Sequence, residues 1–136
     1  MTTLKVLSAG AVKRGVARVA AAFEQDAGVK VVIEFVPVPE VRRRIGSGEA
    51  ADVVVATPAA LDEMAAQNKI DAASRGFLGR SRVGIVIHAD APLPAVADVE
   101  SFKKLLLDAS HVVRNEASSG IYVEKLLEKL GLVEAL

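Results

Sequence analysis

The chain has no cysteine among its 136 residues. This absence excludes disulfide bonds, thiol catalysis and thiolate-bound metal sites. Aromatic residues make up only 4%, so any core must be built from valine, leucine, isoleucine and alanine. An excess of charge is also missing, because 17 lysines and arginines balance 17 aspartates and glutamates. Without a basic stripe to neutralise phosphates, nucleic acid is not an expected partner.

No apolar run in the sequence is long enough to cross a bilayer. The stretch from Met1 to Val6 goes directly into a strand pattern and lacks the basic, apolar and small-residue regions of a signal peptide. By this criterion the chain is cytoplasmic, or a leader has been removed from it. Hydrophobic residues nevertheless reach 51% and the mean hydropathy is +0.35, which predicts a surface partly covered by a partner.

Short apolar runs alternate with segments of helical periodicity along the whole chain. Gly28 and Gly131 stand where a helix would end, whereas Thr57-Pro58 and Asp98 stand where one would begin. Strands are expected at 4–8, 29–36, 51–56, 82–88 and 111–114, and helices at 12–28, 40–45, 58–68, 98–109 and 120–130. This alternation predicts an α/β fold with a parallel sheet, in which strand 29–36 is buried on both faces.

Three turns after expected strands carry small or hydroxyl residues and run into helix starts. In parallel sheets, ligands bind beyond the carboxyl ends of the strands. The free N–H groups and the dipole of a helix start favour a negatively charged group there. The residues expected to bind a small oxyanion are therefore Ser8, Ala9, Gly10, Ala11, Thr57, Ser118, Ser119, Gly120 and Tyr122.

A structural alternative exists for each turn, because serine and threonine before a helix are most often caps. For Tyr122 the alternative is packing in the core or at the rim. Arg42-Arg43-Arg44 is expected to be a solvated helix face, and the two histidines lack partners at metal-ligand spacing. The sequence contains no P-loop, nucleophile–base pair or metal-ligand cluster. We therefore expect no catalysis, no metal and no cofactor.

Four stretches resemble the periplasmic molybdate-binding-protein family of extracellular solute-binding proteins. Together they cover nearly the whole chain in the family's order and spacing. They are Leu4–Val12, Ala51–Asp62, Ser81–Ile85 with the following Ala91-Pro92 and Pro94, and Ala117–Tyr122.

The resemblance implies a two-lobed type II periplasmic-binding fold whose lobes close on an oxyanion. That ligand would be of the molybdate, tungstate or sulfate class, and it would be delivered to an ABC permease. Residues 1–88 would then form lobe one with its crossing strand, and residues 89–136 part of lobe two. The Ser8–Ala11 and Thr57 turns would belong to lobe one, and the Ser118–Gly120 turn to lobe two. A periplasmic or extracellular location is also implied, beside the cytoplasmic alternative.

The chain departs from this family's pattern at two points. After the second expected strand, members usually have a hydroxyl or glycine turn, but here Pro37 and Pro39 remove N–H donors. The family also continues beyond the position of Leu136 into the rest of lobe two. Exposed apolar faces and a homodimer are therefore expected. One arrangement of that dimer exchanges the second-lobe segment across Ala89–Pro94.

The leading hypothesis is a substrate-binding protein for a small oxyanion, in a shortened form, and not an enzyme. The alternative is a ligand-sensing or protein-interaction module of the same fold, as in the effector domains of bacterial transcription regulators. An enzyme is a third hypothesis, which rests only on the range of chemistries that α/β folds host.

Overall fold

The computed structural model describes residues 2–135. The chain divides into two compact units, Met1–Ser81 and Arg82–Leu136. The division falls at the start of the apolar segment 82–88, which the resemblance assigns to lobe one. The assignment of 1–88 and 89–136 to two lobes stays a prediction.

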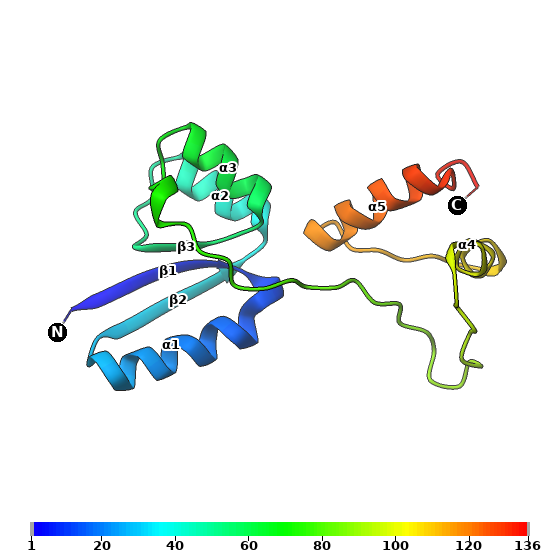
Figure 1. Ribbon diagram of the computed structural model, residues 1–136, viewed down its shortest axis with the longest axis horizontal. Coiled ribbons are helices and arrows are strands. Elements are labelled where there is room, and N and C mark those ends of the chain that lie inside the picture. Colours follow the sequence, from blue (N-terminus) through cyan, green and yellow to red (C-terminus); the bar gives the residue numbers. More distant parts are fainter. Residues whose placement is uncertain (1, 136) are drawn as a thin grey trace. The chain divides into compact units, whose positions relative to one another are not determined.

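The first unit is built on a three-stranded sheet. Its strands are β1 (Thr3–Ala9), β2 (Lys30–Val36) and β3 (Val53–Val55), in the order β2-β1-β3, and both pairings are parallel (Figure 1). Each strand is followed by a helix, as parallel pairing requires, because the chain must return to the same end of the sheet. The predicted α/β class with a parallel sheet is confirmed.

The helices of this unit begin directly beyond the strands. After β1 a 3-10 turn, η1 (Gly10–Val12), leads into α1 (Lys13–Ala27); α2 (Val38–Gly46) follows β2, and α3 (Pro58–Ala66) follows β3. A second 3-10 turn, η2, spans Ala72–Ser74. Gly28 ends α1 in the left-handed conformation, with φ of 64°, as its position predicts. The helix start at Thr57-Pro58 is likewise confirmed.

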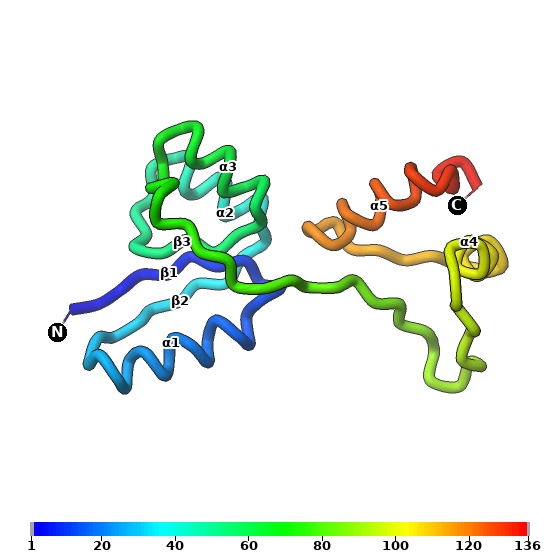
Figure 2. The backbone as a smooth tube through the Cα atoms, in the orientation of Figure 1, coloured from blue at the N-terminus to red at the C-terminus, as the bar shows by residue number. Residues whose placement is uncertain are grey.

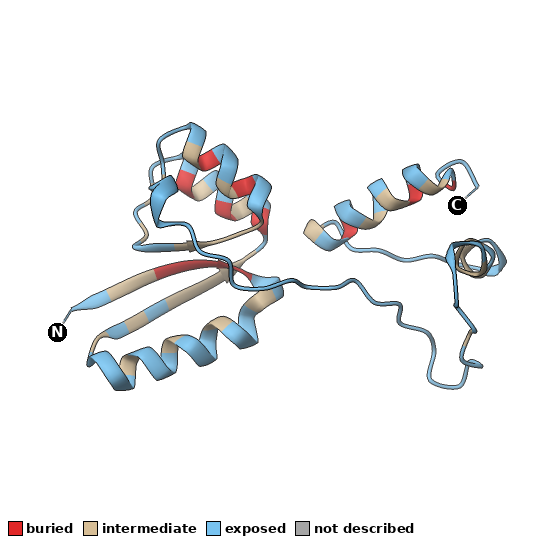
Figure 3. Cartoon of the chain, viewed as in Figure 1, coloured by how far each residue is buried: buried red, intermediate tan, exposed pale blue. Residues whose placement is uncertain are grey.

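The core of the first unit lies between the sheet and the helices α2 and α3 (Figure 3). Alternate residues of a strand point to opposite faces, so Leu7 and Ala9 of β1 share one face. Both pack against apolar side chains at helical spacing on α2 and α3. The core residues are Leu7, Ala9, Val38, Val41, Ile45, Ala60 and Met64.

The opposite face of the sheet, which α1 covers, is less closely packed. No residue of α1 is buried, and Val19 on this helix is 67% exposed. No residue of β2 is fully buried either, and Val32 is exposed. The prediction that 29–36 is buried on both faces is therefore wrong. The cause is that β2 is an edge strand with one neighbour, and a single amphipathic helix covers its second face only in part.

Arg44 of α2 holds a network of charged groups across β1, β2 and the segment before β3. Its guanidinium donates to Glu49 at 2.6 Å and to Glu34 at 2.9 Å, and Lys5 Nζ donates to Glu49 at 2.7 Å. The Arg44 side chain is only 15% exposed. The expectation of a solvated arginine face is therefore wrong at Arg44, because its guanidinium is paired with Glu34 and Glu49. These bonds, from Arg44 first and then from Lys5, lower the pKa of Glu49 to about 2.

The second unit contains the helices α4 (Val99–Asp108) and α5 (Ser118–Leu130). Asp98 starts α4 as predicted: its carboxylate accepts from Ser101 N at 2.8 Å, and the Ser101 hydroxyl accepts from Asp98 N at 3.0 Å. Gly131 ends α5 with φ of 70°, also as predicted. In the turn that follows, Leu132 N donates to the Leu127 carbonyl oxygen at 3.0 Å, and both leucines are buried.

The two strands expected in the second unit, 82–88 and 111–114, are absent from its described residues. The predictions of strands at 82–88 and 111–114 are therefore wrong. A strand exists through hydrogen bonds to a neighbouring strand, and among the residues that the structure describes no backbone hydrogen bond joins either segment to another strand. Both segments are therefore exposed and irregular, although their apolar, β-branched composition is typical of strands.

Candidate functional site

Two of the predicted ligand-binding turns lie side by side at the carboxyl edge of the sheet (Figure 1). Ser8 of β1 pairs with Val55 of β3, so the turn that begins at Ala9-Gly10 neighbours the turn at Thr57-Pro58. The topology β2-β1-β3 thus brings together chain segments almost fifty residues apart in sequence.

Ser8 itself is fully buried beneath this edge. Its hydroxyl donates to the carbonyl oxygen of Ala9 at 3.2 Å, so it is already engaged within the chain. Ala9 is also buried, whereas Gly10 and Ala11 are exposed. At this turn, the groups that solvent reaches are therefore those of Gly10 and Ala11, which have small side chains that let a ligand approach the backbone.

Thr57 is the N-cap residue of α3, but its side chain makes no capping hydrogen bond. Pro58 at the first helical position has no N–H to satisfy. At the start of α1, no side chain caps the 3-10 turn or the helix either. Neither Ser8 nor Thr57 therefore makes the side-chain hydrogen bond to a helix N–H group that the structural alternative assumes.

Acidic side chains separate the helix starts into two groups. Helices α2 and α4 carry Glu40 and Glu100 in their first turns, and α4 is also capped by Asp98. The first turns of α1, α3 and α5 contain no acid. An acid beside a helix start occupies the position that the dipole offers to an anion. The three turns singled out from the sequence are therefore followed by the helix starts that carry no acidic side chain.

Lys13 adds positive charge to the same edge. It is the first residue of α1, and its ammonium group lies 5.6 Å from the centroid of the Phe35 ring, within reach of a cation–π contact. Phe35 pairs with Ser8 across the sheet. A cation at a helix start opposes the dipole, so Lys13 adds little to helix stability there. The sequence reading did not single out Lys13, although a lysine in a helix's first turn is such a signal.

The start of α5 is occupied by a side chain that the sequence reading also missed. Asn115 Oδ1 accepts from Ala117 N at 3.0 Å and from Gly120 N at 3.1 Å, and the Asn115 amide donates to Ser119 Oγ at 2.9 Å. Two of the predicted donors, Ser119 and Gly120, are thus bonded within the chain. An asparagine three residues before a helix could have predicted these bonds, because its side chain can fold back onto the backbone of the first turn.

The remaining predicted residues differ in their access to solvent. Tyr122 is 57% exposed, so it is not a core residue of the second unit. Ser118 is half-buried. Gly120 is buried against the backbone of Asn115, and a Cβ there would meet the Asn115 carbonyl oxygen at 1.6 Å.

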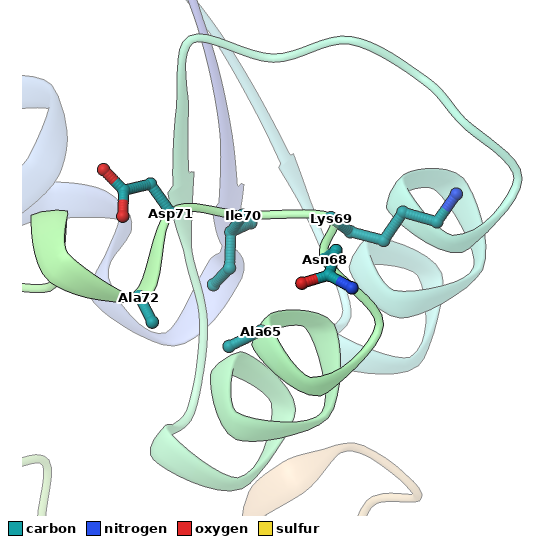
Figure 4. Close-up of a pocket in the computed structure, with 6 residues that line it drawn as sticks. All are labelled: Ala65, Asn68, Lys69, Ile70, Asp71 and Ala72. Carbon is teal, nitrogen blue, oxygen red and sulfur yellow. The ribbon is translucent and has the colours of Figure 1, made fainter.

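Two hollows in the surface lie away from these residues. One of about 490 Å³ opens in the first unit beside the end of α3 (Figure 4), and its lining residues are Ala65, Asn68, Lys69, Ile70, Asp71 and Ala72. The other, of about 250 Å³, is lined by Val112, Arg114, Glu124, Leu127 and Val133. None of the nine predicted ligand-binding residues lines either hollow.

Residues 2–135 contain neither a metal site nor a membrane-spanning helix. No group of three histidine or acidic side chains is placed to hold a metal ion. None of the helices in this part of the chain combines the length and the apolar character that crossing a membrane requires.

Comparisons with known proteins identify relatives over most of the chain. The sequence model of a family described as bacterial extracellular solute-binding proteins matches residues 4–136. A curated relative, an aconitate isomerase from a Pseudomonas species, is 33% identical over 132 residues, which are 93% of this chain and 50% of the relative. The chain thus spans about half the length of this relative.

A solved structure gives a weaker match. It is assigned to the substrate-binding domain of a molybdenum ABC transporter from Clostridium difficile, with 16% identity and a TM-score of 0.45. The match covers 49% of this chain and 30% of that one.

Proposed function

Because this chain belongs to the family of bacterial extracellular solute-binding proteins, we propose that it binds a small anion at the carboxyl edge of its sheet. The observation that carries this proposal is the pair of adjacent helix starts after β1 and β3. Neither has a side-chain cap, and neither has an acid in its first turn. Their N–H groups and dipoles would stabilise a negative charge, and Lys13 would attract it from solvent.

The ligand is proposed to be an oxyanion, and two chemical classes fit such a site. One is the tetrahedral class of molybdate, tungstate and sulfate, which the predicted neutral donors suit. The other is a small carboxylate, which is supported by the 33% identity to an aconitate isomerase, since aconitate carries three carboxyl groups. Both present oxygens that accept hydrogen bonds from backbone N–H groups.

Ser118, Ser119, Gly120 and Tyr122 are proposed as a second set of contacts. In the structure, a carboxamide oxygen of Asn115 accepts from the α5 start. An anion oxygen would take the place of this Asn115 oxygen. A ligand held from both units would stabilise a closed form of the protein, because only that form makes both sets of contacts.

By its family, the protein is proposed to work outside the cytoplasm and to deliver its ligand to an ABC permease. The alternative is that the same fold serves as a ligand-sensing or protein-interaction module. Co-purification with a membrane permease would support transport, and co-purification with a DNA-binding partner would support sensing. Recovery of the native protein in the cytoplasmic fraction of the source cells would contradict the transport proposal.

A second candidate function is isomerisation of aconitate, which only the curated relative favours. The proposed binding role involves no catalysis. Incubation of the protein with cis- or trans-aconitate, followed by proton NMR, separates the two. Conversion at a rate proportional to protein concentration would overturn the purely binding role.

Thermal unfolding in the presence of anions tests the binding proposal. Molybdate, tungstate, sulfate, phosphate and the two aconitates would each be added at constant ionic strength, with chloride as the control. A ligand at 100 times its Kd should add about 2.7 kcal/mol to the stability and raise Tm. If none of these anions raises Tm above the chloride control, the proposed binding function fails.

A pair of variants then tests the second set of contacts. Ser119→Ala removes a hydroxyl from the α5 start, whereas His111→Ala removes an exposed side chain that lies outside the proposed site. The affinity for the anion that gave the largest Tm shift should fall more in Ser119→Ala than in His111→Ala. Equal affinities in the two variants would remove Ser119 from the site.

Self-association is the last part of the proposal. The second unit exposes many large apolar side chains, including Val86 at 94% and Val113 at 91%. Exposed apolar surface of this extent is typical of an interface. We propose a homodimer, in which exchange of a segment across Ala89–Pro94 is one arrangement. Light scattering at micromolar concentration should give twice the chain mass.

A further inference from the structure

Residues 82–88 form an extended, mostly apolar segment (Figure 2), which belongs to no strand in the part of the chain that the structure describes. Val83, Ile85, Val86 and Ile87 are all exposed large hydrophobic residues. No backbone hydrogen bond joins residues 82–87 to any other residue that the structure describes. Free N–H and C=O groups along a β-branched segment are a template for pairing with another strand.

We propose that this segment pairs with the same segment of a second copy, as two antiparallel strands related by a two-fold axis at Ile85. In this register Arg82 stands opposite His88 of the partner, Val83 opposite Ile87, and Ile85 opposite itself. The inference rests on the proposed homodimer, but not on the proposed anion binding.

The charges at the two ends of the segment favour this direction. Arg82 lies at one end, and at the other the His88 ring lies 3.6 Å from the Asp90 carboxylate. Antiparallel pairing places each Arg82 directly opposite the partner's His88 and near its Asp90, so the opposite charges of Arg82 and Asp90 meet twice. Parallel pairing would instead set Arg82 beside Arg82 and Asp90 beside Asp90. Opposite charges across strands stabilise a pair, and like charges destabilise it.

The alternation of side chains between the two faces of the strand favours the axis at Ile85. Successive side chains of a strand point to opposite faces, so Val83, Ile85 and Ile87 share one face. With the axis at Ile85, the same three residues of both copies lie on the same side of the two-stranded ribbon. A slip by one residue would place this apolar face of one copy on the side of Arg82, Gly84, Val86 and His88 of the other, where the apolar contact is broken at both ends.

Single cysteines test the register directly, because the chain contains no other cysteine. Residues directly opposite in an antiparallel pair have Cα atoms about 4.5–5.5 Å apart, which a disulfide can span. Ile85→Cys should therefore form a disulfide-linked dimer under mild oxidation at micromolar concentration. Two matched controls are Val86→Cys, which has Gly84 as its opposite residue, and Leu93→Cys outside the segment.

If disulfides formed by random collision, the more exposed control positions would react faster than position 85. Val86 is 94% exposed and Leu93 89%, against 54% for Ile85. We expect Ile85→Cys to form the linked dimer about tenfold faster than either control, because pairing raises the local concentration of the two thiols. If either control reacts as fast as Ile85→Cys, the proposed axis is wrong.

Charge reversal tests the pairing without a covalent bond. Arg82→Glu and Asp90→Arg should each weaken dimerisation by about tenfold, since each places like charges together twice. An equimolar mixture of the two variants should form a heterodimer, in which both pairs of positions 82 and 90 are again opposite in charge. Sedimentation velocity measures each association. A mixture that associates no better than the separate variants would overturn the pairing.

The outcomes also separate this inference from the proposed function. If Arg82→Glu is monomeric but keeps the anion-induced rise in Tm, strand pairing and anion binding are both supported. A dimer without any anion response leaves the pairing intact and contradicts the binding function. A monomeric wild-type chain whose 82–87 amides are protected from hydrogen exchange would mean that the segment pairs within its own chain, and the inference fails.

Discussion

At the scale of single residues, the candidate site depends on groups that are left without a partner by their neighbours. The turns at Gly10 and Thr57 follow the ends of the paired strands β1 and β3, and neither helix start has a side-chain cap. Asn115, in contrast, fills the start of α5 from within the chain. The difference between an open and a filled helix start thus depends on one side chain.

Lys13 provides the first prediction at this scale. Lys13→Met should weaken anion binding about three- to fivefold, because a cation beside the helix start no longer attracts the ligand. The loss should shrink as salt is added, since salt screens exposed charges. Titration calorimetry at low and high salt measures both effects. The control is Lys129→Met, a lysine in the last turn of α5; an equal loss there would show that only net charge matters.

Glu49 provides a prediction about pH. Its pKa is about 2 in the folded protein, against an ordinary value of 4.5, chiefly because Arg44 donates to its carboxylate. The carboxylate therefore contributes to stability above pH 4.5, and this contribution is lost as the pH falls from 4.5 toward 2. Urea midpoints at pH 7 and pH 3 should differ less in Glu49→Gln than in the wild type. Glu128→Gln should behave as the wild type, and an unchanged pH dependence in Glu49→Gln would contradict the role of the network.

At the scale of elements, local chemistry determined which features could be predicted. The helix ends at Gly28 and Gly131 and the start at Asp98 depend on residues close in sequence, so the pattern alone predicts them. The strands at 82–88 and 111–114 required a partner strand, which no local pattern supplies. For the same reason, the burial of β2 was overestimated, because its place at the sheet edge follows from topology.

Alanine substitutions at two helical glycines should change the stability of the protein in opposite directions. At Gly120 a Cβ would collide with the Asn115 carbonyl oxygen, so Gly120→Ala should destabilise the α5 start by about 1–3 kcal/mol. At Gly15 in α1 nothing lies within 4 Å of a Cβ, so Gly15→Ala should stabilise its helix by up to about 1 kcal/mol. Urea unfolding and hydrogen exchange of each helix measure these changes. Stabilisation by Gly120→Ala would contradict the close contact with Asn115.

At the scale of the whole molecule, the chain is a family member with a small parallel sheet and a second unit without strands in its described residues. The core between the sheet and the helices α2 and α3 fixes the edge at which two helix starts meet. The sequence predicted this edge because strand–helix alternation implies it. It could not predict whether the third turn, at Ser118–Gly120, reaches the same ligand, because that depends on how separate parts of the chain come together around it.

The central claim is that a small anion binds between the helix starts that follow β1 and β3. The most direct test follows backbone amide signals by NMR while molybdate or trans-aconitate is added at constant ionic strength. With at least one of these anions, the amides of Gly10, Ala11, Ala59 and Ala60 should show the largest saturable shifts. If neither anion moves these four amides, or if the shifts spread evenly over exposed lysines and arginines, the claim is contradicted.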